Sequence, residues 1–274
     1  MSENKADIQR QIEEIDGKLY KLLMERTELV KQNPHPVRIE NLFSEEARGI
    51  RRILKFHTGE FPEYVVAKIW REILSTDVNM NKKLKIAVYG DEKDVSLLYQ
   101  VQEHFGSYIE VSILSSYSQV FNLVTSREAD IAIVPSNNNE MNTKPWWNAL
   151  FADKNKESLS IVAKLPFIRG NNIAPENEGY VLALSPSEAS GIDNSLFAVE
   201  TDIDVSHSTI TETLNALGFA EAKLIVSVNT EETKYSLVDA KGFCKTEELR
   251  KLEIPEVFKN LHLAGTYARP IILS

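Results

Sequence analysis

The chain has 274 residues, of which 43% are hydrophobic and 26% are charged, and its formal net charge is −9. This balance excludes collagen-like, wholly disordered and coiled-coil-only chains, and the acidic charge argues against a general binder of nucleic acid or anionic membranes. The single cysteine, Cys244, excludes a disulfide within the chain and points to a reducing compartment. No apolar stretch approaches the roughly eighteen residues of a membrane span, and the polar N-terminus does not resemble a secretion signal. We therefore expect a cytoplasmic protein.

The first predicted element is one long helix over residues 6–32. Its apolar positions recur at alternating spacings of four and three, the heptad pattern of helices that pack on one another. The seam consists of Ile8, Ile12, Ile15, Leu19, Leu22, Arg26 and Leu29. At 1.5 Å per residue the helix is roughly 40 Å long and would project from a small domain. We therefore expect a homodimer through this segment.

Two further helices follow. Pro34 and Pro36 end the first helix, Ser44 is the predicted N-cap of a second helix that runs to about Phe56, and Pro62 begins a third. The apolar stripe of the third helix comprises Val66, Ile69, Ile73 and Met80.

A charged residue interrupts each of two helical stripes. Arg26 is either a snorkelling arginine or one held inward to meet an anionic ligand, and the spacing leaves both interpretations open. Asp77, between Ile73 and Met80, is expected to face solvent because it lies near a helix end. These charges make the helical front the candidate site.

The periodicity changes near residue 84. The short β-rich runs KLKIAVYG, YIEVSILS, ADIAIVP and LSIVAKL alternate with other segments, which predicts a parallel α/β lobe over residues 84–167. Residues 168–190 contain the expected linker, with one strand at YVLALS. From residue 195 the pattern is βαββαβ, the ferredoxin-like order.

Several kinds of chemistry lack sequence support. No histidine pairs with another histidine or with Cys244 at a metal-ligand spacing, and no glycine-rich phosphate loop occurs, so we expect neither a metal nor a cofactor. Cys244 is interpreted as a buried small side chain, and Trp146-Trp147 as a packed cap on the α/β lobe rather than a stacking platform.

Particular residues of the helical front carry a family pattern. They are Ile12, Ile15-Asp16, Leu19, Leu22-Leu23, Glu25-Arg26, the Glu46 helix and FPEYVVAKIWREI. This pattern resembles the all-helical chorismate mutase family. The segments KLKIAVYG, ADIAIVPSNNN and LSIVAKL look like the first part of prephenate dehydratase, and the end LHLAGTYARP is similar to an ACT domain.

The resemblance implies a multi-domain α + α/β protein. It would have a three-helix dimerising domain at 1–83, a truncated dehydratase-like lobe at 84–180 and a ferredoxin-like, ACT-like domain at 181–274. The dehydratase family's Thr-Arg-Phe motif is absent, so that lobe is expected to be inactive. The effector-loop motifs of the ACT family are also absent, which leaves a structural or dimerising role equally open for the last domain.

The resemblance also implies a set of mutase site residues. Arg26 matches the family's second arginine and Glu46 its glutamate, which makes these two the candidate catalytic residues. Arg38, Arg48 and Asn81 are the candidate substrate-binding residues. Three positions depart unfavourably from the family, namely Gln9, Glu45 and Asp77.

Three functional hypotheses follow. The first is a working chorismate mutase that rearranges chorismate, a small dicarboxylate, to prephenate. Such an enzyme needs only to position a dianion and stabilise developing charge. The second is a catalytically inactive regulatory or ligand-binding relative. The third is an unrelated helical dimerisation module attached to an α/β binding domain.

Overall fold

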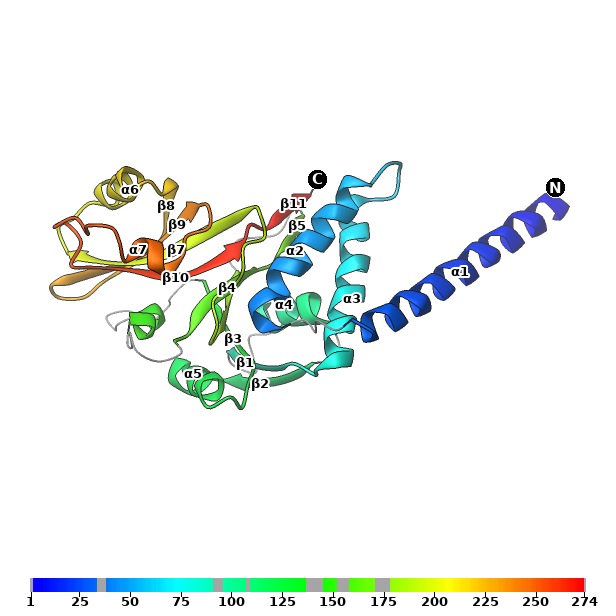
Figure 1. Ribbon diagram of the computed structural model, residues 1–274, viewed down its shortest axis with the longest axis horizontal. Helices are drawn as coiled ribbons and strands as arrows, with labels where there is room; N and C mark the ends of the chain where they lie inside the picture. Colours follow the sequence, from blue (N-terminus) through cyan, green and yellow to red (C-terminus); the bar gives the residue numbers. More distant parts are fainter. Residues whose placement is uncertain are drawn as a thin grey trace.

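The computed structural model describes residues 2–33, 38–90, 96–106, 109–136, 145–151, 158–170 and 178–273. The chain is a mixed α/β protein in which a helical front packs against a large sheet (Figure 1). Pro34 and Pro36, which were expected to end the first helix, lie outside the described residues.

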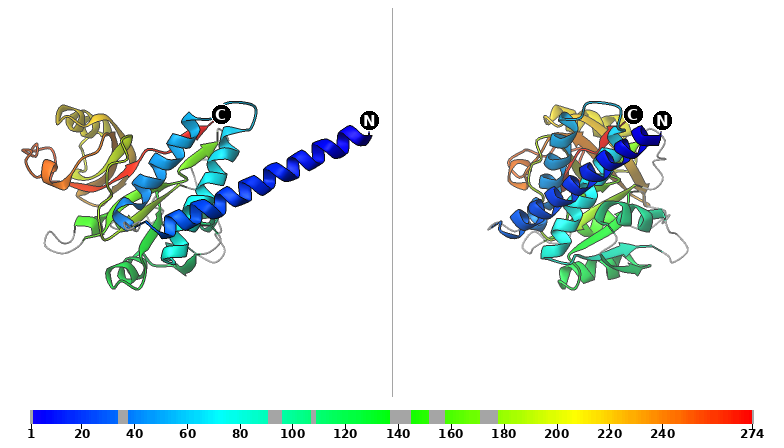
Figure 2. Two further views of the ribbon diagram at one scale, coloured as in Figure 1. Left: turned by 45° about the vertical axis from the view of Figure 1, so that its right-hand side comes forward. Right: turned by 90° about the vertical axis from the view of Figure 1, so that its right-hand side faces the viewer.

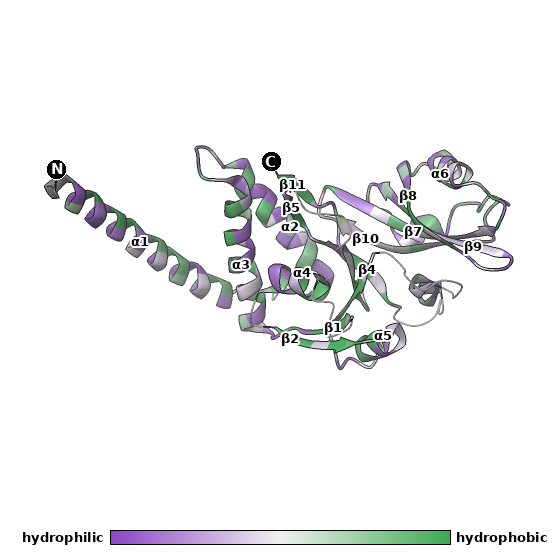
Figure 3. Ribbon diagram, turned by 180° about the vertical axis from the view of Figure 1, so that it is seen from behind, coloured by the Kyte–Doolittle hydropathy of each residue, from purple (hydrophilic) through white to green (hydrophobic). Residues whose placement is uncertain are grey.

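The helical front consists of three helices. They are α1 (Ser2–Lys31), α2 (Ile39–Lys55) and α3 (Glu63–Asn81). Helix α1 projects away from the rest of the chain, and the N-terminus lies at its far end (Figures 1 and 2). Hydrophobic and hydrophilic stretches alternate along it (Figure 3), and six apolar residues of the predicted seam are exposed: Ile8, Ile12, Ile15, Leu19, Leu22 and Leu29. The long projecting helix is confirmed.

The start of α2 differs from the prediction. The helix begins at Ile39 with Arg38 as N-cap, so Ser44 lies inside its second turn and the predicted cap at Ser44 was wrong. The Arg38 backbone N–H donates to Asn41 Oδ1 at 2.9 Å, while the Ser44 hydroxyl donates to the Asn41 carbonyl oxygen at 3.0 Å. The helix therefore begins earlier than predicted, and Ser44 occupies an internal position of α2. Pro62, by contrast, is the N-cap of α3, close to its predicted place.

A nine-stranded sheet forms the body of the described chain, in the order β2-β1-β3-β6-β4-β10-β7-β9-β8. Its first half contains β1 (Lys85–Tyr89), β2 (Glu110–Leu114), β3 (Ile131–Pro135), β4 (Ser160–Leu165) and β6 (Gly179–Ala183). Strands β1, β2 and β3 are mutually parallel, but β6 lies between β3 and β4 and runs antiparallel to both. The four strands of the predicted lobe, β1 to β4, run in one direction as expected, whereas the assignment of β6 to a linker was wrong. Residues 179–183 are all buried, so this strand belongs to the core.

Helices cover the two faces of this half of the sheet. Alternate residues of β1 point to opposite faces, as the pleat requires. Ile86 packs with α4 (Ser96–Phe105) and α2, while Ala87 packs with α5 (Tyr117–Thr125) and η1 (Trp146–Phe151). Trp146 and Trp147 are buried in that second layer, which confirms the packed cap. The helical front and α4 therefore share one face of the sheet.

The second half of the sheet has the predicted βαββαβ order. Its elements are β7 (Asp193–Asp202), α6 (His207–Ala216), β8 (Ala220–Asn229), β9 (Thr233–Lys241), α7 (Thr246–Leu249) and β10 (Asn260–Ala268). The strand order β10-β7-β9-β8 is antiparallel throughout. Cys244 is buried there, as expected. Strands β5 (Ile168–Gly170) and β11 (Ile271–Leu273) form a separate parallel pair.

The two halves of the sheet meet where Gly265 of β10 pairs with Ile161 of β4. Gly265 has a φ of +153°, and a Cβ at this position would lie 2.1 Å from the Ile161 carbonyl oxygen. Only glycine fits this approach of two backbones. The junction therefore depends on the absence of one side chain.

Candidate functional site

A cavity of about 490 Å³ lies among α1, α2, α3 and α4. This volume is within the range of small-molecule sites. Its lining includes two arginines, three carboxylates and a histidine, namely Arg26, Arg52, Glu45, Glu46, Asp77 and His104. The helical front thus supplies three sides of the cavity, and α4 of the sheet lobe supplies the fourth.

Arg26 forms an ion pair across the cavity with Asp77. The Arg26 Nη1 to Asp77 Oδ2 distance is 2.5 Å, and the side chain of Asp77 is only 12% exposed. The expectation that Asp77 faces solvent was therefore wrong, because the inward arginine gives it a partner. Burial raises the pKa of Asp77, although its hydrogen bond and attraction to Arg26 act to lower it. Asp77 consequently accepts a proton more readily than an ordinary aspartate.

Glu46 belongs to a buried cluster with Arg71 of α3 and His104 of α4. Arg71 Nη1 lies 2.7 Å from Glu46 Oε1, and His104 Nε2 lies 3.3 Å from Glu46 Oε2. All three side chains are less than one-tenth exposed. Each carboxylate oxygen keeps a second acceptor direction, so Glu46 can also accept a hydrogen bond from a ligand in the cavity.

One tautomer of His104 fits its contacts best. Arg71 can only donate, and its Nη1 lies 2.5 Å from His104 Nδ1 and 3.1 Å from Nε2, while Nε2 lies 3.3 Å from Glu46 Oε2. An acceptor at Nδ1 and a proton on Nε2, facing Glu46, satisfy both partners. Burial lowers the pKa of His104, and Arg71 lowers it further, which keeps the ring neutral. Burial acts to raise the pKa of Glu46, yet the interactions with Arg71 and His104 bring it below its ordinary value. The cluster therefore contains one negative charge, on Glu46, and one positive charge, on Arg71, while His104 is neutral.

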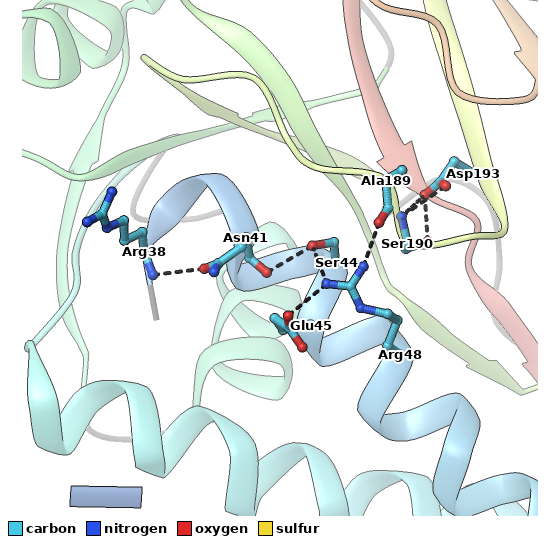
Figure 4. Close-up of polar contacts among 8 residues, drawn as sticks. All are labelled: Arg38, Asn41, Ser44, Glu45, Arg48, Ala189, Ser190 and Asp193. Atoms are coloured by element: carbon cyan, nitrogen blue, oxygen red, sulfur yellow. Dashed lines mark hydrogen bonds and ion pairs between the residues drawn. The ribbon is translucent and has the colours of Figure 1, made fainter. Parts of the chain in front are cut away.

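Two of the predicted binding residues lie away from this cavity. Arg48 is not part of the lining although its Nη2 pairs with the cavity residue Glu45 at 2.8 Å, and its Nη1 donates to the Ala189 carbonyl oxygen at 2.7 Å (Figure 4). Arg38 is exposed, and its side chain points away from the other residues drawn in Figure 4. Neither residue is part of the cavity lining.

Arg52 is the second arginine of the lining, and it is not among the residues predicted from the sequence. It follows Glu45 by seven positions, about two full turns, so the two residues share one face of α2. Among the described residues Arg52 makes no ion pair. Helical spacing from Glu45 could have identified it.

The remaining predicted positions are at the two ends of the helical front. Asn81 is the last residue of α3, and its side chain lies outside the described residues. Gln9 is exposed on the projecting part of α1, where its amide donates to Glu13 Oε1 at 3.4 Å. In the described part of the chain, no three residues of the His, Cys, Asp and Glu types gather as metal ligands. None of its helices combines the length and apolarity needed to cross a membrane.

Comparison with known proteins bears on the family. No protein-family profile matches the chain. A bifunctional chorismate mutase/prephenate dehydratase of Aquifex aeolicus strain VF5 is 28% identical over 145 residues, which make up 50% of this chain and 40% of the relative. The matched part thus spans less than half of that relative's length.

Solved structures were also compared. A prephenate dehydratase of Arthrobacter aurescens in complex with L-Phe has 13% identity and a TM-score of 0.44, covering 70% of this chain and 93% of that one. The quorum quenching acylase GqqA has 15% identity and a TM-score of 0.44, covering 67% and 94%. The sequence relative confirms the predicted resemblance: this chain is similar to a bifunctional chorismate mutase/prephenate dehydratase.

Proposed function

We propose that the chain is a chorismate mutase, acting as a cytoplasmic homodimer, that rearranges chorismate to prephenate. The observation that carries this proposal is one cavity of about 490 Å³ that brings Arg26, Arg52 and Glu46 together. Arg26 and Glu46 are the two residues that the family resemblance selects. Arg52 adds the second cation that a dicarboxylate requires.

The two arginines would receive the substrate in different ways. Arg52, without an ion pair among the described residues, is available to one carboxylate as a planar fork. Arg26 is held by Asp77, so the other carboxylate must displace that partner. Displacement weakens the attraction to Arg26 that acts to lower the pKa of Asp77, while burial raises this pKa, so the neutral acid becomes more favourable and the repulsion of the dianion falls.

The chemistry needs no covalent intermediate. The bond that breaks and the bond that forms lie within one substrate molecule, so the protein has to hold a folded conformer and stabilise the charge that develops. Glu46, oriented by Arg71 and His104, would accept from the ring hydroxyl. Asn81 stays a predicted donor to the ether oxygen.

A second copy of the chain would complete the front. The apolar seam of α1 is exposed to water, which is unfavourable, and the α1 helix of a second copy would bury it. The partner would bring the region around Gln9 toward the open side of the site. The dehydratase-like lobe and the ACT-like region at 181–274 are proposed to be non-catalytic, and no cofactor takes part.

A non-catalytic, ligand-binding relative is the second candidate. The observation that favours it is the charge of the lining, where Glu45, Glu46 and Asp77 outnumber Arg26 and Arg52. If these carboxylates stay ionised, they oppose a dianion and weaken the stabilisation that catalysis requires. Such a protein would bind a ligand in this cavity without turning it over.

The decisive experiment follows chorismate consumption in the ultraviolet with the purified full-length chain. Arg26→Ala and Arg52→Ala should each reduce kcat/KM by roughly a hundredfold, the usual effect of removing one preorganised donor. Lys55→Ala removes one exposed charge from the last turn of α2 and is the matched control, with turnover unchanged. Absence of turnover in a folded wild-type protein that still binds chorismate would favour the second candidate.

A further inference from the structure

A second cavity lies behind the first, between α3, α4 and β5. Its volume is about 320 Å³, and its walls include the rings of Tyr64, Tyr99 and Phe167. Lys68 and Glu103 lie at its side and form an ion pair with each other. Three aromatic rings thus share the walls with polar and aliphatic side chains, and the charges of Lys68 and Glu103 neutralise one another.

Arg71 connects this second cavity with the candidate site. Its Nη1 is occupied by Glu46 and His104, and Phe167 lies against the guanidinium at 5.2 Å from ring centroid to Cζ. Nη2 is buried and has no hydrogen-bond partner in the described part of the chain. A buried guanidinium nitrogen without an acceptor is unusual, because burial removes water and leaves the donor unsatisfied.

The chemistry of this arrangement selects one class of ligand. One unsatisfied donor on a guanidinium that already has one carboxylate suits a second, singly charged carboxylate better than a doubly charged phosphate. The aromatic walls suit a flat apolar body. We propose that this cavity binds a small aromatic carboxylate, with its oxygen on Arg71 Nη2 and its ring against Phe167 and Tyr99.

The site would communicate with the mutase cavity through a shared guanidinium, an effect that rests on the proposed function. A carboxylate on Nη2 competes for the positive charge that Arg71 shares with Glu46. Glu46 lines the first cavity, so a ligand in the second one changes how strongly Glu46 accepts a hydrogen bond there. Linkage makes the effect reciprocal: substrate in the first cavity changes ligand affinity in the second by the same factor.

The probe is 3-phenylpropanoate, titrated calorimetrically into the full-length chain without any substrate. Its neutral match is 3-phenylpropan-1-ol, which has the same ring and chain but no carboxylate. We expect a dissociation constant in roughly the millimolar range for a fragment of this size, and about tenfold weaker binding of the alcohol.

Three variants test in which of the two cavities the acid binds. Tyr99→Ala removes an exposed wall of the second cavity and should weaken the acid at least about fivefold. Arg71→Lys keeps the charge but removes the free nitrogen, and should make the acid and the alcohol bind alike. Arg52→Ala alters only the first cavity and should leave binding unchanged.

Clear results would overturn the proposal. They are equal binding of acid and alcohol by the wild type, no heat up to about 10 mM of the acid, or binding lost in Arg52→Ala but kept in Tyr99→Ala. The last result would place the acid in the first cavity. Because the assay contains no chorismate, its outcome is independent of whether the protein catalyses turnover.

Discussion

Glu45 and Glu46 are neighbouring carboxylates whose truncation should have very different consequences for stability. Glu45 pairs with Arg48 at 2.8 Å, and the two side chains are 54% and 42% exposed to solvent. Glu46 pairs with Arg71 at 2.7 Å, and the two side chains are 9% and 5% exposed. The two substitutions to Ala remove the same charge from the same helix, so the difference between them reports the effect of burial.

The expected magnitudes follow from the partner left behind. Glu46→Ala leaves the Arg71 charge buried without its carboxylate, which costs about 3–5 kcal/mol of unfolding free energy. Glu46 also borders the cavity, and water admitted there places the value near the lower end, about 3 kcal/mol. Glu45→Ala should cost less than about 1 kcal/mol, because its partner returns to water.

Urea unfolding at pH 7, followed by far-ultraviolet circular dichroism, measures both values. The double variant Glu46→Ala/Arg71→Met provides the control, because it removes the stranded charge together with its partner. It should recover at least about 2 kcal/mol relative to Glu46→Ala alone. If Glu46→Ala costs no more than Glu45→Ala, the cluster is hydrated and the argument for a desolvated ion pair is refuted.

Three other predictions concern pH, the sheet junction and assembly. The lowered pKa of His104 means that the folded state binds fewer protons than the unfolded state, so stability should fall as pH drops below the ordinary value of 6.5; His104→Asn should flatten this dependence in melting temperatures measured between pH 5 and 7.5. Gly265→Ala should cost at least about 2 kcal/mol in urea unfolding, because the new Cβ would lie 2.1 Å from the Ile161 carbonyl oxygen, and a loss under 1 kcal/mol would mean that the two strands separate easily. Leu19→Glu should convert the proposed dimer to a monomer in sedimentation velocity, whereas Lys18→Glu, outside the predicted seam, should not; a dimer that survives Leu19→Glu would have its interface elsewhere.

The sequence was most informative where the periodicity was long. The seam of α1 and the βαββαβ order at the end of the chain could both be predicted, because each depends on many residues that repeat one pattern. The place of β6 could not be predicted, because the pattern of one strand does not report which neighbours it pairs with. That strand was assigned to a linker although it lies between β3 and β4 in the middle of the sheet.

The candidate site shows a similar division. Arg26 and Glu46 could be chosen from a resemblance, and both line the cavity. Arg71 and His104 could not be chosen, because they lie on α3 and α4 and reach Glu46 only after the sheet lobe packs against the helical front. No spacing within one helix reports such a contact.

Three arginines within one turn and a half of α2 illustrate what distinguishes a candidate binding residue from a structural one. Arg51 donates to Ser190 Oγ and to the carbonyl oxygens of Ile192 and Arg269, each at 2.9 Å. Arg48 is likewise engaged, by the Ala189 carbonyl oxygen and by Glu45 (Figure 4). Arg51 and Arg48 Nη1 donate to the C-terminal half of the chain and attach α2 to it, while Arg48 Nη2 is engaged by Glu45, so both arginines have few donors left for a ligand. Arg52 has no ion pair in the described residues and faces the cavity. Arg48 and Arg51 therefore fix the rotation of α2 about its axis so that Arg52 points into the cavity.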